Sequence, residues 1–266
     1  MADLNPISLW KRFLALPNDN RGKTIAVAIL VAALCSLFVT GATVVLRPIQ
    51  QANRAAETQL RLEALIDAIP GMEAMLEADD GATLSTVVVD LETGMAARDV
   101  TPDTLDAALQ DPANYANLDD NQDIAGIDTR PRYVQIYILR RDDRVETAIF
   151  PMIGSGYNGP IEAMVALTGD MNTIAGMTVT RQSETPGLGA RIEEPGWQAG
   201  FQGTQVRDPA GTMKFAVARG PAVSPYEVDG ITGASRTGRG VTQMVRFWLG
   251  PDGYGPVIDA IRRREF

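Results

Sequence analysis

The sequence contains no histidine and a single cysteine, Cys35. The missing histidines exclude Ser-His-Asp and Cys-His catalysis, histidine-ligated haem and most zinc sites. One thiol neither holds an iron–sulfur cluster nor forms an intramolecular disulfide. Cys35 lies inside an apolar run, where we expect it to act as a small hydrophobic residue. We therefore predict no catalytic residue and no metal site among the chain's own side chains.

Positive charge is also scarce. The 266 residues carry 24 Lys and Arg against 33 Asp and Glu, which gives a formal net charge of -9. Because phosphate backbones select for Lys and Arg, this balance argues against a nucleic acid as partner. The length is sufficient for one large domain or two small ones and an anchor.

Charged residues are absent from 24–46, a run of Ala, Val, Leu and Ile. About 20 such residues span the apolar core of a bilayer. A signal peptide is the alternative interpretation, but this run is too long for its apolar region, and Arg47-Pro48 stands where small residues should mark cleavage. We therefore predict a retained transmembrane helix.

Basic residues flank this span unequally. Four precede it and three follow it: Lys11, Arg12, Arg21 and Lys23, then Arg47, Arg54 and Arg61. The positive-inside rule modestly favours a cytoplasmic N-terminus over 1–23. The C-terminal part would then lie in the oxidising periplasm, which suits a segment without cysteine. After the span, apolar residues at helical spacing predict a juxtamembrane helix over 47–70.

The remainder of the chain is rich in strand patterns. Five segments are expected strands: 86–91, 133–139, 145–150, 161–168 and 173–180. Two pairs of them form expected hairpins, whereas 111–132 resembles a long surface loop. Because these strands follow one another without helices between them, we expect an antiparallel α+β domain over 71–266.

Two glycine motifs are candidate ligand loops. Residues 154–159 match the dinucleotide pattern G-x-G-x-x-G, but Pro160 and a strand follow where that pattern requires a helix. We therefore interpret it as a strand connection. Residues 184–189, Glu-Thr-Pro-Gly-Leu-Gly, form a compact loop whose backbone could approach a planar ligand or an anion, or a simple strand exit.

The third motif, Asp229-Gly-Ile-Thr-Gly-Ala-Ser235, precedes a helical pattern that continues to Leu249. Ser235 should lie just before or within the first turn, where amides and the helix dipole favour a phosphate. Arg236 and Arg239 could offset its charge or remain solvated. A polar turn that starts a helix is the simpler interpretation.

Together these segments resemble the C subunit of the sodium-pumping NADH:quinone oxidoreductase family. The resemblance rests on the single span, the strand that ends at Gly154, the loop 184–189, the motif 229–235 and the tail 247–256. The loop and the motif recur in the G subunit of the related Rnf complex, which is the alternative. The Phe-Trp-Leu-Gly tail and the acidic stretch before the hairpins favour the sodium pump.

The resemblance implies an FMN joined by a phosphoester to Ser235, where the family usually has Thr. Thr232 and Thr237 are the fallback acceptors, and Asp229 begins the motif that a separate flavin transferase recognises. Other expected cofactor contacts are Gly233, Ala234, Glu184 as a nearby charge, and Thr185, Leu188 and Gly189 against the ring. Trp197 and Trp248 could stack on the ring, but we favour core packing for both.

The resemblance further implies electron transfer from an intramembrane iron–sulfur centre, through this FMN, to the FMN of the B subunit. The expected partners are the A, B, D, E and F subunits of an inner-membrane complex that oxidises NADH, reduces ubiquinone and exports sodium. The FMN-binding region would occupy about 130–250. Another class of function, a membrane-tethered binding module without redox chemistry, remains open.

Overall fold

The computed structural model describes residues 15, 17, 21–38, 40–41, 83–142 and 144–265. The chain divides into two units, Met1–Leu60 and Arg61–Phe266. The predicted helix over 47–70 lies outside the described residues, and so do 71–82 at the start of the predicted domain.

In the first unit, Arg21–Phe38 form a helix that is long and apolar enough to cross a membrane. Its large apolar side chains, including Ile25, Leu37 and Phe38, are exposed. Water would oppose such exposure, whereas lipid accommodates it. The predicted span over 24–46 is therefore helical through Phe38, and again at 40–41.

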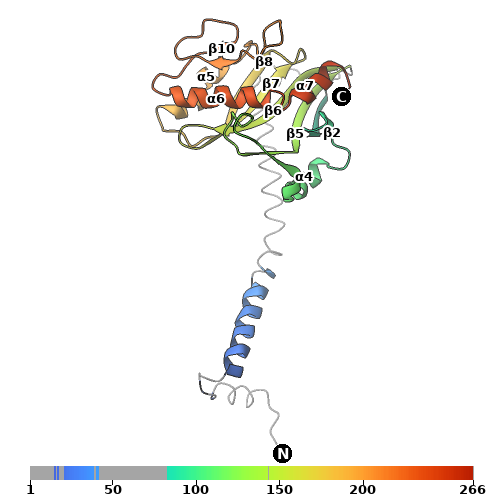
Figure 1. The fold of residues 1–266 in the computed structure, drawn as a ribbon, viewed down its shortest axis with the longest axis vertical. Coiled ribbons are helices and arrows are strands. Elements are labelled where there is room, and N and C mark those ends of the chain that lie inside the picture. The colour runs from blue at the N-terminus through green and yellow to red at the C-terminus, as the bar shows by residue number, and fades with distance from the viewer. Residues whose placement is uncertain are drawn as a thin grey trace, which may run out of the picture. The chain divides into compact units, whose positions relative to one another are not determined.

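The second unit is built on a six-stranded sheet in the order β2-β1-β5-β6-β7-β8, and every neighbouring pair is antiparallel (Figure 1). The strands are β1 (Thr83–Asp90), β2 (Met95–Ala96), β5 (Tyr133–Arg141), β6 (Arg144–Ser155), β7 (Pro160–Thr168) and β8 (Ile174–Arg181). β5 to β8 form a meander, and their β-branched residues suit its pleated surface. Both predicted hairpins and the α+β class are confirmed.

Short elements lie between β2 and β5 and between β8 and two C-terminal helices. They are α4 (Pro102–Ala108), η1 (Pro112–Asn114), β3 (Tyr115–Asn117), β4 (Thr129–Pro131), η2 (Gly189–Glu193), α5 (Pro195–Ala199), β9 (Ala216–Val217) and β10 (Glu227–Val228). The helices are α6 (Ser235–Trp248) and α7 (Gly255–Arg262). The expected loop over 111–132 thus contains η1 and a small β3–β4 ladder.

The main core lies between one face of the sheet and the two C-terminal helices, which cross it in Figure 1. Val241, Met244, Val245 and Trp248 supply the buried stripe of α6, at the spacing expected of an amphipathic helix. A smaller apolar cluster, which includes Leu139 and Ile149, lies on the other face of the sheet.

Two glycines allow α6 to approach β6 closely. A Cβ on Gly154 would lie 2.7 Å from Cβ of Met244, and one on Gly240 would lie 2.5 Å from the carbonyl oxygen of Ser155. Neither position has room for a side chain. The G-x-G-x-x-G segment therefore ends β6 and connects it to β7, which confirms the interpretation that it is a strand connection. The fold thereby holds the N-terminus of α6 next to this connection.

Candidate functional site

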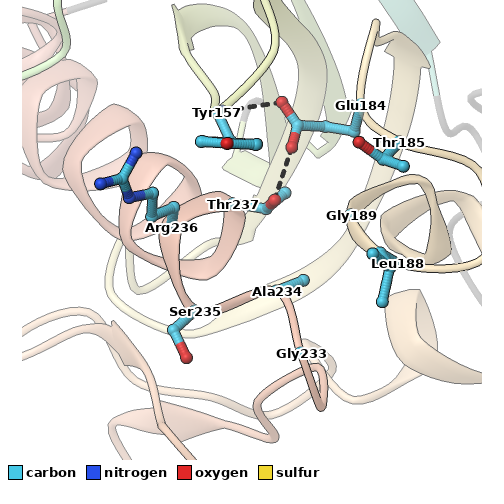
Figure 2. A pocket seen from close by; sticks show the side chains of 10 residues that line it. All are labelled: Tyr157, Glu184, Thr185, Leu188, Gly189, Gly233, Ala234, Ser235, Arg236 and Thr237. Carbon is cyan, nitrogen blue, oxygen red and sulfur yellow. Dashed lines mark hydrogen bonds between the residues drawn. The ribbon is translucent and has the colours of Figure 1, made fainter.

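Three segments that are distant in sequence surround a pocket of about 360 Å³. They are the β6–β7 connection, the loop after β8 and the first turn of α6 (Figure 2). The lining residues are Tyr157, Glu184, Thr185, Leu188, Gly189, Gly233, Ala234, Ser235, Arg236 and Thr237. Seven of the eight cofactor contacts expected from the sequence are among them; Thr232 is not.

The N-terminus of α6 opens into this pocket. Ser235 is the first residue of the helix, and Ala234 at the N-cap has no side-chain oxygen with which to cap it. Within the described chain, the first amide donor of the helix with an acceptor is Gly238, which donates to the carbonyl oxygen of Ala234. The amides of Ser235, Arg236 and Thr237 are therefore free to bind a ligand. Such uncapped amides, with the helix dipole, favour an anionic group such as phosphate.

The three candidate hydroxyls differ in their surroundings. Ser235 is exposed and lines the pocket, and its side chain points away from Glu184 in Figure 2. Thr237 is buried, and its Oγ1 donates to Oε2 of Glu184 at 2.5 Å. Thr232 is exposed but lies outside the pocket lining. Of the three, only Ser235 combines accessibility with a place beside the free amides.

Glu184 is a buried carboxylate that lines the pocket. Its Oε1 accepts hydrogen bonds from the amides of Tyr157 at 2.8 Å and Asn158 at 2.9 Å, while Oε2 accepts from Thr237. All three bonds cross between separate segments of the chain, and Figure 2 shows the carboxylate between Tyr157 and Thr237. Hydrogen bonds to a charged acceptor are about twice as strong as neutral ones. Glu184, expected from the sequence as a nearby charge, thus also links three segments of the chain.

Two glycines leave the space that the Glu184 carboxylate occupies. A Cβ on Gly189 would lie 2.5 Å from Oε2 of Glu184 and 2.6 Å from Oγ1 of Thr237, and one on Gly156 would collide with Oε1. Gly233, in the turn before α6, has φ +80°, which favours glycine. Small residues in these segments therefore serve both packing and ligand approach.

Sequence reasoning missed Tyr157. It lies on the strand connection, where its exposed ring lines the pocket and carries the guanidinium of Arg236 at 5.1 Å from the ring centroid. This is a cation–π distance. As expected, the Gly-rich β6–β7 connection is not a dinucleotide motif. No local sequence signal indicates that this connection contacts α6.

The remaining predicted residues lie outside the pocket lining. The carboxylate of Asp229 accepts from the amide of Ala222 at 2.6 Å, and its carbonyl oxygen accepts from Nε1 of Trp197 at 2.8 Å. Trp248 is buried against Tyr254 and donates to the carbonyl oxygen of Ile153 at 2.7 Å. Both tryptophans therefore have packing roles, as favoured from the sequence.

The fold and pocket define a domain that can hold a planar ligand against a Gly-rich loop, with an anionic group at a helix N-terminus. In agreement, residues 156–250 match the FMN-binding domain family. This chain belongs to the family of C subunits of the Na(+)-translocating NADH-quinone reductase. The resemblance found in the sequence is thereby confirmed.

Family membership rests on matches over nearly the whole chain. The chain is 34% identical to the C subunit from Pseudomonas aeruginosa, over 93% of this chain and 98% of that protein. It is 36% identical to the C subunit from Yersinia pestis, over 92% and 94%. The crystal structure of Shewanella oneidensis NqrC matches with a TM-score of 0.62 and 26% identity, over 72% of this chain and 88% of that one.

Proposed function

We propose that this chain is an electron-transfer subunit of a Na(+)-translocating NADH-quinone reductase, a membrane translocase and oxidoreductase, and that it carries FMN through a phosphoester to Ser235. The observation that carries the proposal is the exposed Ser235 hydroxyl beside three free amides on the pocket. Bound FMN supplies reversible uptake and release of electrons. The chain's own polar groups around the pocket bind and orient it.

The residues present fit such a group. The amides of Ser235, Arg236 and Thr237 provide donors for a phosphate, and Arg236 adds a positive charge at the same end. Leu188 and Tyr157 present apolar surface, while the absence of a Cβ at Gly189 allows close approach to the backbone. A covalent link also means that the pocket alone need not supply the affinity.

We further propose the route and the partners. Electrons would reach this protein from an intramembrane iron–sulfur centre held by neighbouring subunits and would leave to the FMN of the B subunit. The A, B, D, E and F subunits would complete the inner-membrane complex, which oxidises NADH, reduces ubiquinone and exports sodium. A flavin transferase would attach FMN after recognising the motif that begins at Asp229.

The relatives from Pseudomonas aeruginosa and Yersinia pestis are C subunits of the sodium pump and align over 94% to 98% of their own length, which favours this proposal over an Rnf G subunit. The FMN-binding domain family by itself is not specific to either complex. The match to C subunits of a quinone reductase also favours this proposal over a non-redox binding module. Copurification with an NADH-oxidising flavoprotein subunit would distinguish the sodium pump from an Rnf complex.

The full chain coexpressed with a flavin transferase tests the attachment. We expect a fluorescent band on a denaturing gel under ultraviolet light, and an intact mass increased by one FMN less one water. Both should vanish in Ser235→Ala and remain in Ser235→Thr, which keeps the nucleophilic hydroxyl. The matched control is Thr212→Ala, which removes an exposed hydroxyl outside the motif and should still be labelled. An unmodified mass for the wild-type chain would refute the proposal.

A further inference from the structure

We propose that Glu184 is a positioning residue that fixes the wall of the pocket and places a negative charge there, so that it opposes electron uptake by the bound cofactor. This inference rests on the proposed function. It assigns Glu184 two effects, one on the geometry of the pocket and one on the redox equilibrium. Each effect has its own measurement.

The positioning effect follows from the partners of the carboxylate. Oε1 holds the β6–β7 connection through the amides of Tyr157 and Asn158, and Oε2 holds the first turn of α6 through Thr237. Glu184 itself belongs to the loop that carries Thr185 and Leu188. One side chain therefore fixes all three segments of the wall relative to one another.

The charge effect follows from the burial of Glu184 and from its partners, which are hydrogen-bond donors and not cations. Each of the three partners donates to the carboxylate, which is the pattern that an ionised acid requires. Among the described residues, no Lys or Arg forms an ion pair with Glu184. Arg236, the charged residue that shares the pocket lining, is placed over the ring of Tyr157. The negative charge is thus stabilised by dipoles but is not neutralised by a paired cation.

The glycines limit screening of this charge. Gly156 and Gly189 lie against the two carboxylate oxygens so closely that neither tolerates a methyl group, and the residue as a whole is only 4% exposed. Charges in such poorly solvated positions act on their neighbours through a lower effective dielectric constant than charges in water. Electrons added to a flavin in the pocket add negative charge, so the fixed anion disfavours the reduced state.

Glu184→Gln separates charge from shape. The amide oxygen can accept from Tyr157 and Asn158 as before. The amide nitrogen can donate to Oγ1 of Thr237, whose hydroxyl then reverses its role from donor to acceptor. The substitution therefore removes one charge with little change in volume. Glu193→Gln is the matched control, because it removes an exposed carboxylate of the neighbouring η2.

The experiment uses the full chain in detergent, coexpressed with a flavin transferase. Intact mass first establishes the covalent load, and reductive titration against reference dyes then gives the midpoint potential. We expect a more positive potential in Glu184→Gln, equivalent to at least about a fivefold higher ratio of reduced to oxidised flavin at a fixed potential. Glu193→Gln should shift this ratio by less than about twofold, because its carboxylate is exposed to solvent. An unchanged potential in loaded Glu184→Gln would overturn the charge effect.

Thr237→Val provides a second test with the opposite sign. It keeps the carboxylate and removes a donor that stabilises and partly screens it, so we expect a more negative potential. This variant decides the charge effect if Glu184→Gln does not fold or load, and an unchanged potential in it then counts against the proposal. A wild-type chain without flavin would instead refute the proposed function. In the unflavinylated proteins, Glu184→Ala removes all three hydrogen bonds and should unfold at a lower urea concentration than Glu193→Ala; equal midpoints would overturn the positioning effect.

Discussion

Gly189 packs so closely against Glu184 and Thr237 that the pocket wall has no room for a methyl group at this position. Gly189→Ala would place a Cβ within 2.5 Å of Oε2 of Glu184 and 2.6 Å of Oγ1 of Thr237. Because both atoms are held in one hydrogen bond, neither moves away without breaking it. We expect a loss of about 1–3 kcal/mol in the free energy of unfolding, the usual cost of overpacking, measured by urea titration.

Gly196→Ala is the control for this prediction. Gly196 lies in α5, and a Cβ there would meet no atom within 4 Å. Alanine in an open helical position is neutral or slightly stabilising. If both substitutions had the same small effect, the close packing around Glu184 would contribute nothing to stability.

The residues that line the pocket were predictable where the signal was local. Thr185, Leu188 and Ser235 belong to short motifs whose small residues and turn geometry indicate access to the backbone. Tyr157 was not predictable in this way, because its role arises when Glu184, 27 residues later, binds its amide. The bond between Glu184 and Thr237 spans 53 residues. Such long-range partners require the fold and cannot be read from periodicity.

At the scale of elements, the N-terminus of α6 is stabilised poorly by the chain itself. Alanine is among the weakest N-cap residues, and Ala234 occupies that position. A negative group at residue 235 should therefore stabilise the helix by about 0.3–1 kcal/mol. We expect unmodified Ser235→Asp to melt about 1–4 °C above the unmodified wild type.

Ser235→Asn is the matched control for Ser235→Asp, because it has nearly the same shape without the charge. Its melting temperature should stay below that of the aspartate variant, and the gap should shrink as salt screens the charge. An aspartate variant no more stable than the asparagine variant would show that the dipole at this end has no measurable effect.

Asp90 at the end of β1 forms a partly buried ion pair with Arg132, the residue before β5. Burial raises the pKa of Asp90, but hydrogen bonds from Arg132 and the Glu92 amide outweigh it and hold the pKa below its ordinary value of 3.8. Because the folded-state pKa is depressed, the stabilisation is present above pH 3.8 and is lost as the pH falls through the folded-state value.

Asp90→Asn tests this assignment. We expect the wild type to exceed the variant in free energy of unfolding by about 1–2 kcal/mol at about pH 6, a modest value because Arg132 is partly exposed. The difference should stay constant above about pH 5 and decrease below pH 3.8. Urea titrations at several pH values measure it. A difference that grew on acidification would contradict the sign of the shift.

Elements were predictable in proportion to their length and regularity. The β5–β6 and β7–β8 hairpins carry uninterrupted β-branched and apolar runs, so their patterns were clear. The β3–β4 ladder has only three residues in each strand, among Asp, Asn and Pro. Its pairing depends on neighbours rather than on propensity, and the sequence indicated only a loop.

At the scale of the whole molecule, the described helix over Arg21–Phe38 and the flavin-domain fold fit a tethered redox protein. A tether limits the volume that a domain explores and so raises its effective concentration near membrane partners. Covalent attachment of the cofactor would serve the same purpose, because neither component is lost by dissociation. Which side of the membrane carries the domain then determines the partners that it can reach.

The excess of basic residues before the span predicts a cytoplasmic N-terminus and a periplasmic domain. Because Cys35 is the sole native thiol, a Cys35→Ser chain allows one cysteine to be placed on either side. Val223→Cys marks the domain at a side chain that is 89% exposed, and Ser8→Cys marks the segment before the span. In spheroplasts, a membrane-impermeant maleimide should label Val223→Cys and leave Ser8→Cys unlabelled until the membrane is permeabilised; in inverted vesicles the pattern should reverse. Labelling of Ser8→Cys alone in intact spheroplasts would contradict the proposed orientation and would place the flavin domain in the cytoplasm.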